Sequence, residues 1–119
     1  MSRTLLMIHG IGCTGDVWNV MAPLFEARGW SCVAPTLFPD LRTQGPPPAE
    51  LPRLGLGDYV EAMASEVRRI EADTGTMPAI IGHSLGGIIT QKLAEQGLGA
   101  AAVLLTPAAP VDCRVPDLR

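Results

Sequence analysis

Residues 80–87 read Ile-Ile-Gly-His-Ser-Leu-Gly-Gly, and they join a short apolar run to a helical pattern. Within this stretch, Gly82, Ser84 and Gly86 have the spacing G-x-S-x-G, which is typical of a tight strand-to-helix turn. A Cβ on either glycine would crowd the turn or the neighbouring strand. We therefore predict that the hydroxyl of Ser84 stands clear of the backbone, where it can act as a nucleophile.

The same turn predicts a site for negative charge at the backbone N–H of Leu85. This amide opens the helix that follows Ser84. The N-terminus of a helix stabilises anions through its free N–H groups and its dipole. We expect Leu85 to provide half of an oxyanion hole, which binds the oxygen that becomes charged when a serine attacks a carbonyl group.

Composition indicates one globular domain. The chain has 119 residues, 47% hydrophobic and 18% charged. A chain of this size buries about two-thirds of its unfolded surface. The net charge is −3 without a basic cluster, so nucleic acid is not an expected partner. No apolar run approaches the roughly 18–20 residues that span a membrane.

The N-terminus and the cysteines favour the cytoplasm. The apolar part of residues 1–9 is too short for a signal peptide. Cys13, Cys32 and Cys113 have neither paired spacing nor the spacing of metal ligands. We expect no disulfide framework and no metal site.

Apolar runs and helical patterns alternate along the chain and predict an α/β fold with a parallel sheet. We expect Asp16 and Asp58 to cap the first two helices, and Pro23 to kink or break the first one. A Pro-rich loop over residues 36–57 is expected to cover the site. The expected strands are 4–8, 31–34, 79–82 and 100–105, and the expected helices are 17–28, 59–74 and 85–96.

A second motif, His9-Gly10-Ile11-Gly12, ends the first expected strand. This motif and residues 82–87, each followed by an amphipathic helix, resemble the N-terminal part of the α/β-hydrolase superfamily of serine esterases and lipases. The resemblance implies a partial α/β-hydrolase fold, one apparently incomplete domain over residues 1–119, with about four parallel strands flanked by helices. If the family order holds, the sheet runs second, first, third, fourth strand.

The resemblance also implies a reaction and the residues that perform it. Ser84 would be the nucleophile, and the backbone N–H groups of Leu85 and Ile11 would form the oxyanion hole. The reaction would be hydrolysis of an ester-like bond in a small acyl substrate through an acyl-serine, and it needs no metal or organic cofactor. We expect His9 to bond to the loop backbone and His83 to pack and form a hydrogen bond beside the turn.

The sequence departs from the family where the general base should be. The family order is serine, then acid, then histidine, and no histidine follows Ser84. Asp112 and Asp117 come after the fourth strand, whereas the family's acid sits after the next one. We expect the chain alone to be weak or inactive, as a fragment, a truncated product or a protein completed by a partner. The fourth strand would be an exposed edge that favours self-association.

Two other interpretations remain open. Residues 10–15 fit the dinucleotide-binding pattern G-x-G-x-x-G. That pattern predicts an acid at the end of the second strand, where the chain has Ala34-Pro35-Thr36, and it leaves residues 82–87 unexplained. The chain could also be a non-catalytic binding module with the hydrolase fold.

The sequence Phe38-Pro39-Asp40-Leu41 differs from the Asp-x-x-Gly-x-Gly of many relatives, so it leaves the substrate pocket undefined.

Overall fold

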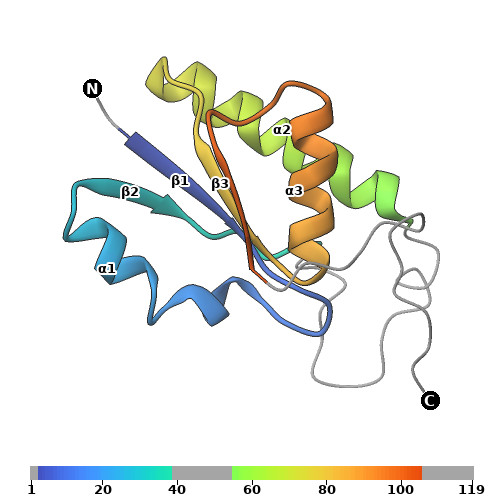
Figure 1. Ribbon diagram of the computed structural model, residues 1–119, viewed down its shortest axis with the longest axis horizontal. Coiled ribbons are helices and arrows are strands. Elements are labelled where there is room, and N and C mark those ends of the chain that lie inside the picture. The colour runs from blue at the N-terminus through green and yellow to red at the C-terminus, as the bar shows by residue number, and fades with distance from the viewer. Residues whose placement is uncertain (1–2, 39–54, 106–119) are drawn as a thin grey trace.

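Four strands form one parallel sheet in the computed structural model (Figure 1): β1 (Arg3–Ile8), β2 (Trp30–Val33), β3 (Ala79–His83) and β4 (Ala102–Leu105). Their order across the sheet is β2-β1-β3-β4, as the family resemblance implies. Leu6 of β1 stands opposite Val33 of β2 and Ile80 of β3, which fixes the register. All strands point the same way, so their C-terminal ends meet at one edge of the sheet.

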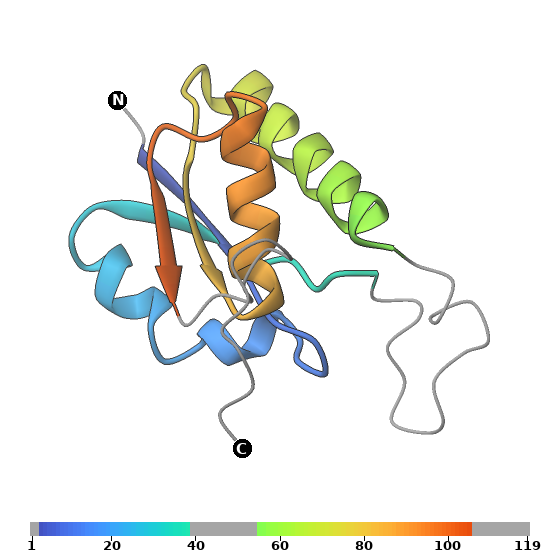
Figure 2. The same ribbon diagram turned by 45° about the vertical axis from the view of Figure 1, so that its right-hand side comes forward.

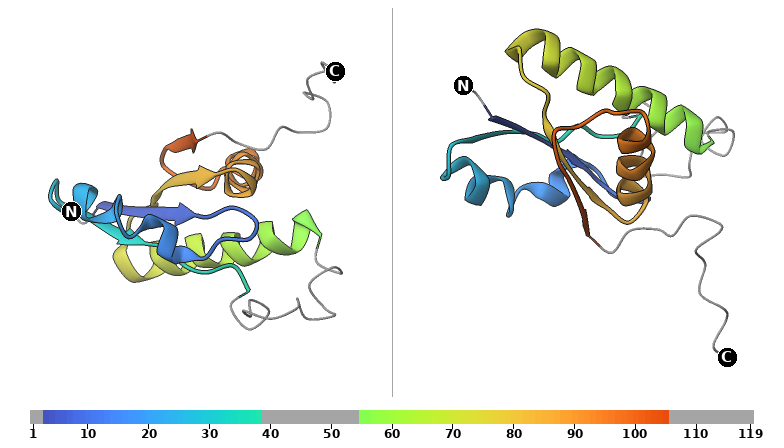
Figure 3. Two further views of the ribbon diagram at one scale, coloured as in Figure 1. Left: turned by 90° about the horizontal axis from the view of Figure 1, so that it is seen from below. Right: turned by 45° about the horizontal axis from the view of Figure 1, so that its top comes forward.

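The structure describes residues 3–38 and 55–105. Two helices, α2 (Leu56–Thr74) and α3 (Leu85–Glu95), cover one face of the sheet. A 3-10 turn, η1 (Gly15–Trp18), and a short helix, α1 (Ala22–Glu26), lie on the other face (Figure 3). Within the described ranges, no helix is both long and apolar enough to cross a membrane.

The core lies in two layers because side chains alternate along β1. Leu6 and Ile8 point to the α2 and α3 side, where they join Ile80 and the buried residues of both helices. Leu5 and Met7 point to the α1 side and pack in the second cluster. The central strand is thus buried on both faces, as its uninterrupted apolar sequence predicts.

The first predicted helix is broken, and half of its apolar stripe does not face the core. The break falls over residues 19–21, and Pro23 is the second residue of α1, where a helix needs no N–H from it. Val20 and Leu24 are 84% and 66% exposed, whereas Trp18 is buried. A 3-10 turn followed by a single α-helical turn cannot keep one continuous stripe on one face.

The predicted caps are wrong at both helices, by two and by three residues. Thr14 caps η1, and its hydroxyl accepts the N–H of Asp16. Gly55 caps α2, which begins at Leu56, inside the expected Pro-rich loop. Asp58 is the third residue of that helix, and its carboxylate accepts the N–H of Gly55 over 2.8 Å. The remainder of the expected loop, residues 39–54, lies outside the described residues.

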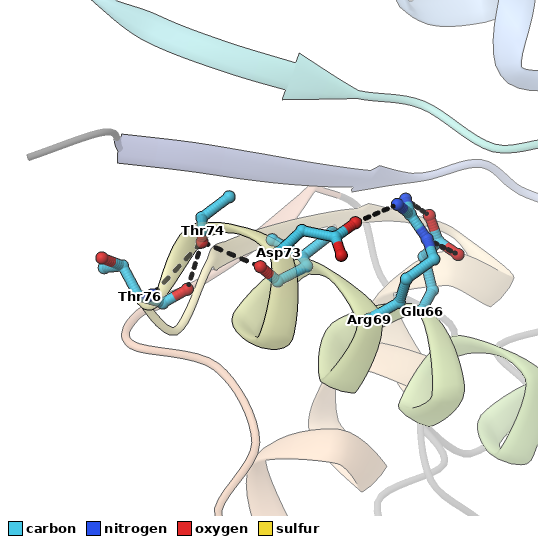
Figure 4. Close-up of polar contacts among 6 residues, drawn as sticks. Glu66, Arg69, Asp73, Thr74 and Thr76 are labelled. Carbon is cyan, nitrogen blue, oxygen red and sulfur yellow. Dashed lines mark hydrogen bonds and ion pairs between the residues drawn. The ribbon is translucent and has the colours of Figure 1, made fainter.

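The C-terminal half of α2 carries its own polar contacts (Figure 4). Arg69 pairs with Glu66 and, over 3.0 Å, with Asp73. The hydroxyl of Thr74 donates to the carbonyl of Ile70 over 2.8 Å and accepts the N–H of Thr76. Gly75, at φ 75°, then ends the helix in the left-handed region.

Candidate active site

Ser84 lies between the last residue of β3 and the first residue of α3. Its φ is 56° and its ψ is −115°, a region that residues other than glycine rarely occupy. Two hydrogen bonds hold it there. Its N–H donates to the carbonyl of Leu105 over 3.2 Å, and its carbonyl accepts the N–H of Gly87 over 2.9 Å. A serine is therefore kept in a strained conformation at the C-terminal edge of the sheet.

Backbone atoms crowd both glycines of the turn. A Cβ on Gly82 would overlap the carbonyl of Gly86 and the hydroxyl of Thr90. A Cβ on Gly86 would overlap the carbonyl of Ile8 in the neighbouring strand. The buried hydroxyl of Thr90 donates to the carbonyl of Gly86 over 2.7 Å. Glycine at position 82 thus permits the close approach of α3 to β3, and glycine at position 86 permits its close approach to β1.

The loop that follows β1 packs against the serine. A Cβ on Gly10 would lie 3.1 Å from Cβ of Ser84 and 3.3 Å from the carbonyl oxygen of His83. This contact follows from the topology, since β1 and β3 are parallel neighbours and end side by side. The structure therefore brings together the two motifs, whose contacting residues Gly10 and Ser84 lie 74 positions apart in the sequence.

The two amides expected to bind an oxyanion lie on either side of this contact. Leu85 is the first residue of α3, so its N–H has no acceptor within the helix. Ile11 follows Gly10 directly, and its side chain is 72% exposed. Neither amide makes a hydrogen bond within residues 3–38 and 55–105. Both N–H groups are free to bind a ligand in the described part of the chain.

His9 is fully buried and bonds to loop backbone, as expected. Its Nε2 accepts the N–H of Leu37 over 2.8 Å. Since Nε2 is an acceptor, Nδ1 carries the proton and donates to the carbonyl of Gly10 over 2.7 Å. Both ring nitrogens are occupied, so His9 cannot take a proton from Ser84 without losing a hydrogen bond.

His83 packs beside the turn, as expected, but the expected hydrogen bond of its side chain is not found within residues 3–38 and 55–105. Its Nδ1 lies 3.6 Å from the position that a Cβ on Gly10 would take. The sequence contains no histidine besides His9 and His83. The acidic candidates Asp112 and Asp117 lie outside the described residues. The described part of the chain therefore presents a serine and two amides, without a third histidine to serve as a base.

Other candidate chemistry is weaker in the described residues. No group of three histidine, cysteine or acidic side chains could hold a metal ion there. Cys32 is a thiol without a disulfide partner among the described residues, and Cys113 lies outside the described ranges. Burial, and to a lesser extent the charge of Glu26, raises the pKa of Cys32 above its ordinary value. That thiol is therefore less reactive than an exposed cysteine.

Two contacts at this site, made by Thr90 and by Leu37, were not predicted from the sequence. Thr90 lies six residues beyond Ser84 within a helix, and nothing in the neighbouring sequence indicates that its hydroxyl bonds to the turn. The bond between Leu37 and His9 joins residues 28 positions apart, and their pairing depends on how the chain leaves β2. Both contacts are defined only by the packed structure.

Comparisons with known proteins agree with this geometry. The sequence model of the alpha/beta hydrolase family matches residues 5–119. A pyrethroid hydrolase of Sphingobium wenxiniae is 30% identical over 91 residues, which are 76% of this chain and 30% of that protein. These matches favour the hydrolase interpretation of residues 10–15 over the dinucleotide-binding one.

Solved structures agree as well. The pyrethroid hydrolase PytH, in a variant with one histidine replaced by alanine, superposes with a TM-score of 0.67 at 26% identity, over 91% of this chain and 41% of that one. A monoacylglycerol lipase of Paleococcus ferrophilus shares the fold, with a TM-score of 0.72 at 20% identity over 98% of this chain and 44% of its own. The chain thus spans less than half the length of these proteins. It belongs to the alpha/beta hydrolase family, of which it represents a partial fold.

Proposed function

We propose that this chain carries the nucleophile half of a serine hydrolase site that cleaves an ester-like bond in a small acyl substrate. Ser84 attacks the carbonyl carbon, and the N–H groups of Leu85 and Ile11 bind the oxygen that becomes negative. The alcohol leaves, and water then releases the acid from the acyl-serine. Each oxyanion donor is worth about 3–4 kcal/mol in the transition state.

One observation carries this proposal: Ser84 holds a positive φ at the end of β3 while Gly10 packs against its Cβ. A strained serine that contacts a loop from the neighbouring strand has no evident structural purpose. Strain of this kind is concentrated at functional sites. The relationship to a pyrethroid hydrolase, an enzyme named for an ester substrate class, supports an ester bond as the target.

The proposed base comes from polypeptide beyond these 119 residues. His9 is committed to Leu37 and Gly10, and His83 is adjacent to Ser84 along the backbone. A serine hydrolase without its base keeps only about 10³–10⁴-fold acceleration over water, from its oxyanion hole and substrate binding. The 119-residue chain should therefore turn over an ester slowly.

A fluorophosphonate probe with adduct mapping by mass spectrometry tests the assignment. The chain should be labelled slowly, with the adduct at Ser84. A longer polypeptide that adds the missing part of the domain should be labelled faster by about a thousandfold or more, at the same serine. Ser84→Ala should abolish labelling, and the matched variant Ser65→Ala, on an exposed position of α2, should not change it.

Three results would decide against the proposal. Labelling at another serine would remove the assignment of Ser84. Equal labelling of the short and long polypeptides would contradict an absent base. Reversible binding of an ester with no adduct in either polypeptide would favour the second candidate function, which is a non-catalytic binding module. The structural observation that favours this second function is that both ring nitrogens of His9 already bond to other groups.

A further inference from the structure

A polar cleft of about 170 Å³ lies between the C-terminal half of α2 and the first residues of β1 and β2. Its lining includes three residues from the strands and three from the helix, namely Thr4, Ser31, Val33, Arg69, Ile70 and Asp73. Ser84 follows β3 at the other end of the sheet, where α3 begins (Figure 2). The cleft is therefore separate from the candidate active site.

Thr4 is the polar residue of β1 that the fold buries. It is 5% exposed, and its side chain makes no hydrogen bond within residues 3–38 and 55–105. Its hydroxyl still reaches solvent, because Nε1 of Trp18 is the sole fully buried side-chain polar atom without a partner in these ranges. A buried polar group normally finds a hydrogen-bond partner. The hydroxyl of Thr4 therefore needs an occupant of the cleft to supply one.

A second hydroxyl lies beside that of Thr4. The register of the sheet places Thr4 opposite Ser31 of β2, and two residues further along it places Leu6 opposite Val33. Side chains alternate along a strand, so Thr4 points to the same face as Leu6, the face that α2 covers. The side chain of Ser31 also makes no hydrogen bond within the described residues. Two neighbouring hydroxyls thus face α2 without partners in the described part of the chain.

The opposite wall of the cleft carries both donors and acceptors. Figure 4 shows the side chains of Arg69 and Asp73 pointing from α2 toward β1. The guanidinium of Arg69 donates to Asp73 through Nη1 and to Glu66 through Nε and Nη2, so two of its five N–H groups remain. The two carboxylates outnumber the guanidinium, which disfavours an anionic ligand.

We propose that this cleft binds a small polyol, a compound with hydroxyl groups on adjacent carbons. Each hydroxyl both donates and accepts a hydrogen bond, so it matches a space where a carboxylate, a guanidinium and two hydroxyls meet. The C–H groups of the polyol pack on Val33 and Ile70. At roughly 30 Å³ for each water, the cleft holds about six waters, a space comparable with a polyol of three or four carbons.

Titration of the full 119-residue chain with erythritol, followed by two-dimensional NMR of the amides, measures this binding. The amide signals of Ser31, Val33 and Ile70 should shift and saturate at millimolar concentrations. Butanediol with hydroxyls at its two ends keeps the four carbons and lacks the inner hydroxyls, so it should bind about fivefold more weakly. Inorganic phosphate and ethylammonium, as the charged probes, should give no saturable shift at these amides.

Paired variants separate the cleft from general effects on folding. Thr4→Val keeps the shape of the side chain and removes the hydroxyl, so it should weaken erythritol binding about fivefold without lowering the melting temperature. Thr76→Val, which removes a hydroxyl outside the lining, is its control and should leave binding unchanged. Asp73→Asn should also weaken binding about fivefold, whereas Glu71→Gln, on the same helix, should not.

Shifts that rise linearly with erythritol and never saturate would overturn the proposal. So would equal affinity for butanediol, unchanged affinity in both Thr4→Val and Asp73→Asn, or saturable binding of phosphate or ethylammonium in place of erythritol. The site uses no residue of the proposed hydrolase machinery, so Ser84→Ala should bind erythritol equally well. Loss of fluorophosphonate labelling at Ser84 with erythritol binding intact would remove the proposed function and leave the cleft's assignment standing.

Discussion

The N–H of Leu37 donates a hydrogen bond of 2.8 Å to Nε2 of His9, and both residues are buried. Leu37 follows β2, whereas His9 follows β1. The bond therefore ties the chain leaving the edge strand to the loop that packs on Ser84. Through Nδ1, the same imidazole also holds the carbonyl of Gly10. One side chain thus fixes the path of the loop that carries Ile11.

Replacing this imidazole should destabilise the fold. His9→Phe removes the hydrogen bond to the buried N–H of Leu37, and a buried group that loses its hydrogen bond costs about 1–3 kcal/mol. It also removes the bond of Nδ1 to the carbonyl of Gly10, which keeps the N–H of Cys13 as a donor. We expect a loss of about 2–4 kcal/mol in the free energy of unfolding, measured by urea denaturation. His9→Gln, which can both donate and accept, should recover part of that loss.

The matched control is His83→Phe. The side chain of His83 is half-buried and makes no hydrogen bond within the described residues. Its replacement should cost less than about 1 kcal/mol. Equal losses from the two phenylalanine variants would mean that the bonds of His9 do not stabilise the loop.

A methyl group at Gly86 should be far more costly than one at Gly57. A Cβ on Gly86 would overlap the carbonyl of Ile8, so α3 must move away from the sheet. We expect Gly86→Ala to lower the free energy of unfolding by about 3 kcal/mol. Gly57 lies in α2 with open space around it, and Gly57→Ala should raise stability by about 0.5 kcal/mol. Urea denaturation of both variants checks the close approach of α3 to β1: Gly86→Ala should lower the free energy of unfolding, and Gly57→Ala should raise it.

The sheet was predictable because its signals are local. Each strand contains a short apolar run with a glycine or a proline within two residues of its last residue. The strand order followed from the resemblance of two motifs to a known family. The turn at Ser84 was predictable for the same reason. Its glycine spacing is a steric requirement that can be read without knowing the fold.

The parts that were wrong depend on competition between local signals. Thr14 and Asp16 can both cap a helix, and the sequence does not say which one accepts the free N–H. The stripe through Val20 and Leu24 has helical spacing, but the break before Pro23 turns it to the surface. Long-range contacts such as Leu37 with His9 leave no periodic trace at all.

The thiol of Cys32 should react only at high pH. Burial is the larger cause of its raised pKa, and the charge of Glu26 adds to it. The pH at which alkylation by iodoacetamide reaches half of its maximal rate should therefore be higher for the folded protein than for the protein unfolded in urea. Glu26→Gln should lower this pH in the folded protein, but not to the value in urea, because burial still raises the pKa. Glu61→Gln on α2 should leave it unchanged.

The raised pKa of Cys32 also predicts how the free energy of unfolding depends on pH. The folded state holds the thiol proton more tightly than the unfolded state, so its contribution is complete below the ordinary thiol pKa. It is lost as the pH rises through the folded value. The free energy of unfolding should fall on this alkaline side, and Cys32→Ala should remove part of the fall. Coincident native and urea midpoints would contradict the prediction.

The strain at Ser84 should appear as a stability gain when glycine replaces it. Glycine adopts φ 56° without the steric cost that a Cβ imposes, whereas Ser84→Ala keeps that cost. We expect Ser84→Gly to be more stable than Ser84→Ala by about 1–2 kcal/mol in urea denaturation. Ser31, in the extended strand β2, supplies the opposite case, since glycine there should be less stable than alanine by about 0.5–1 kcal/mol. The same sign at both positions would mean that the turn stores no strain, and the argument for Ser84 as a nucleophile would lose its structural basis.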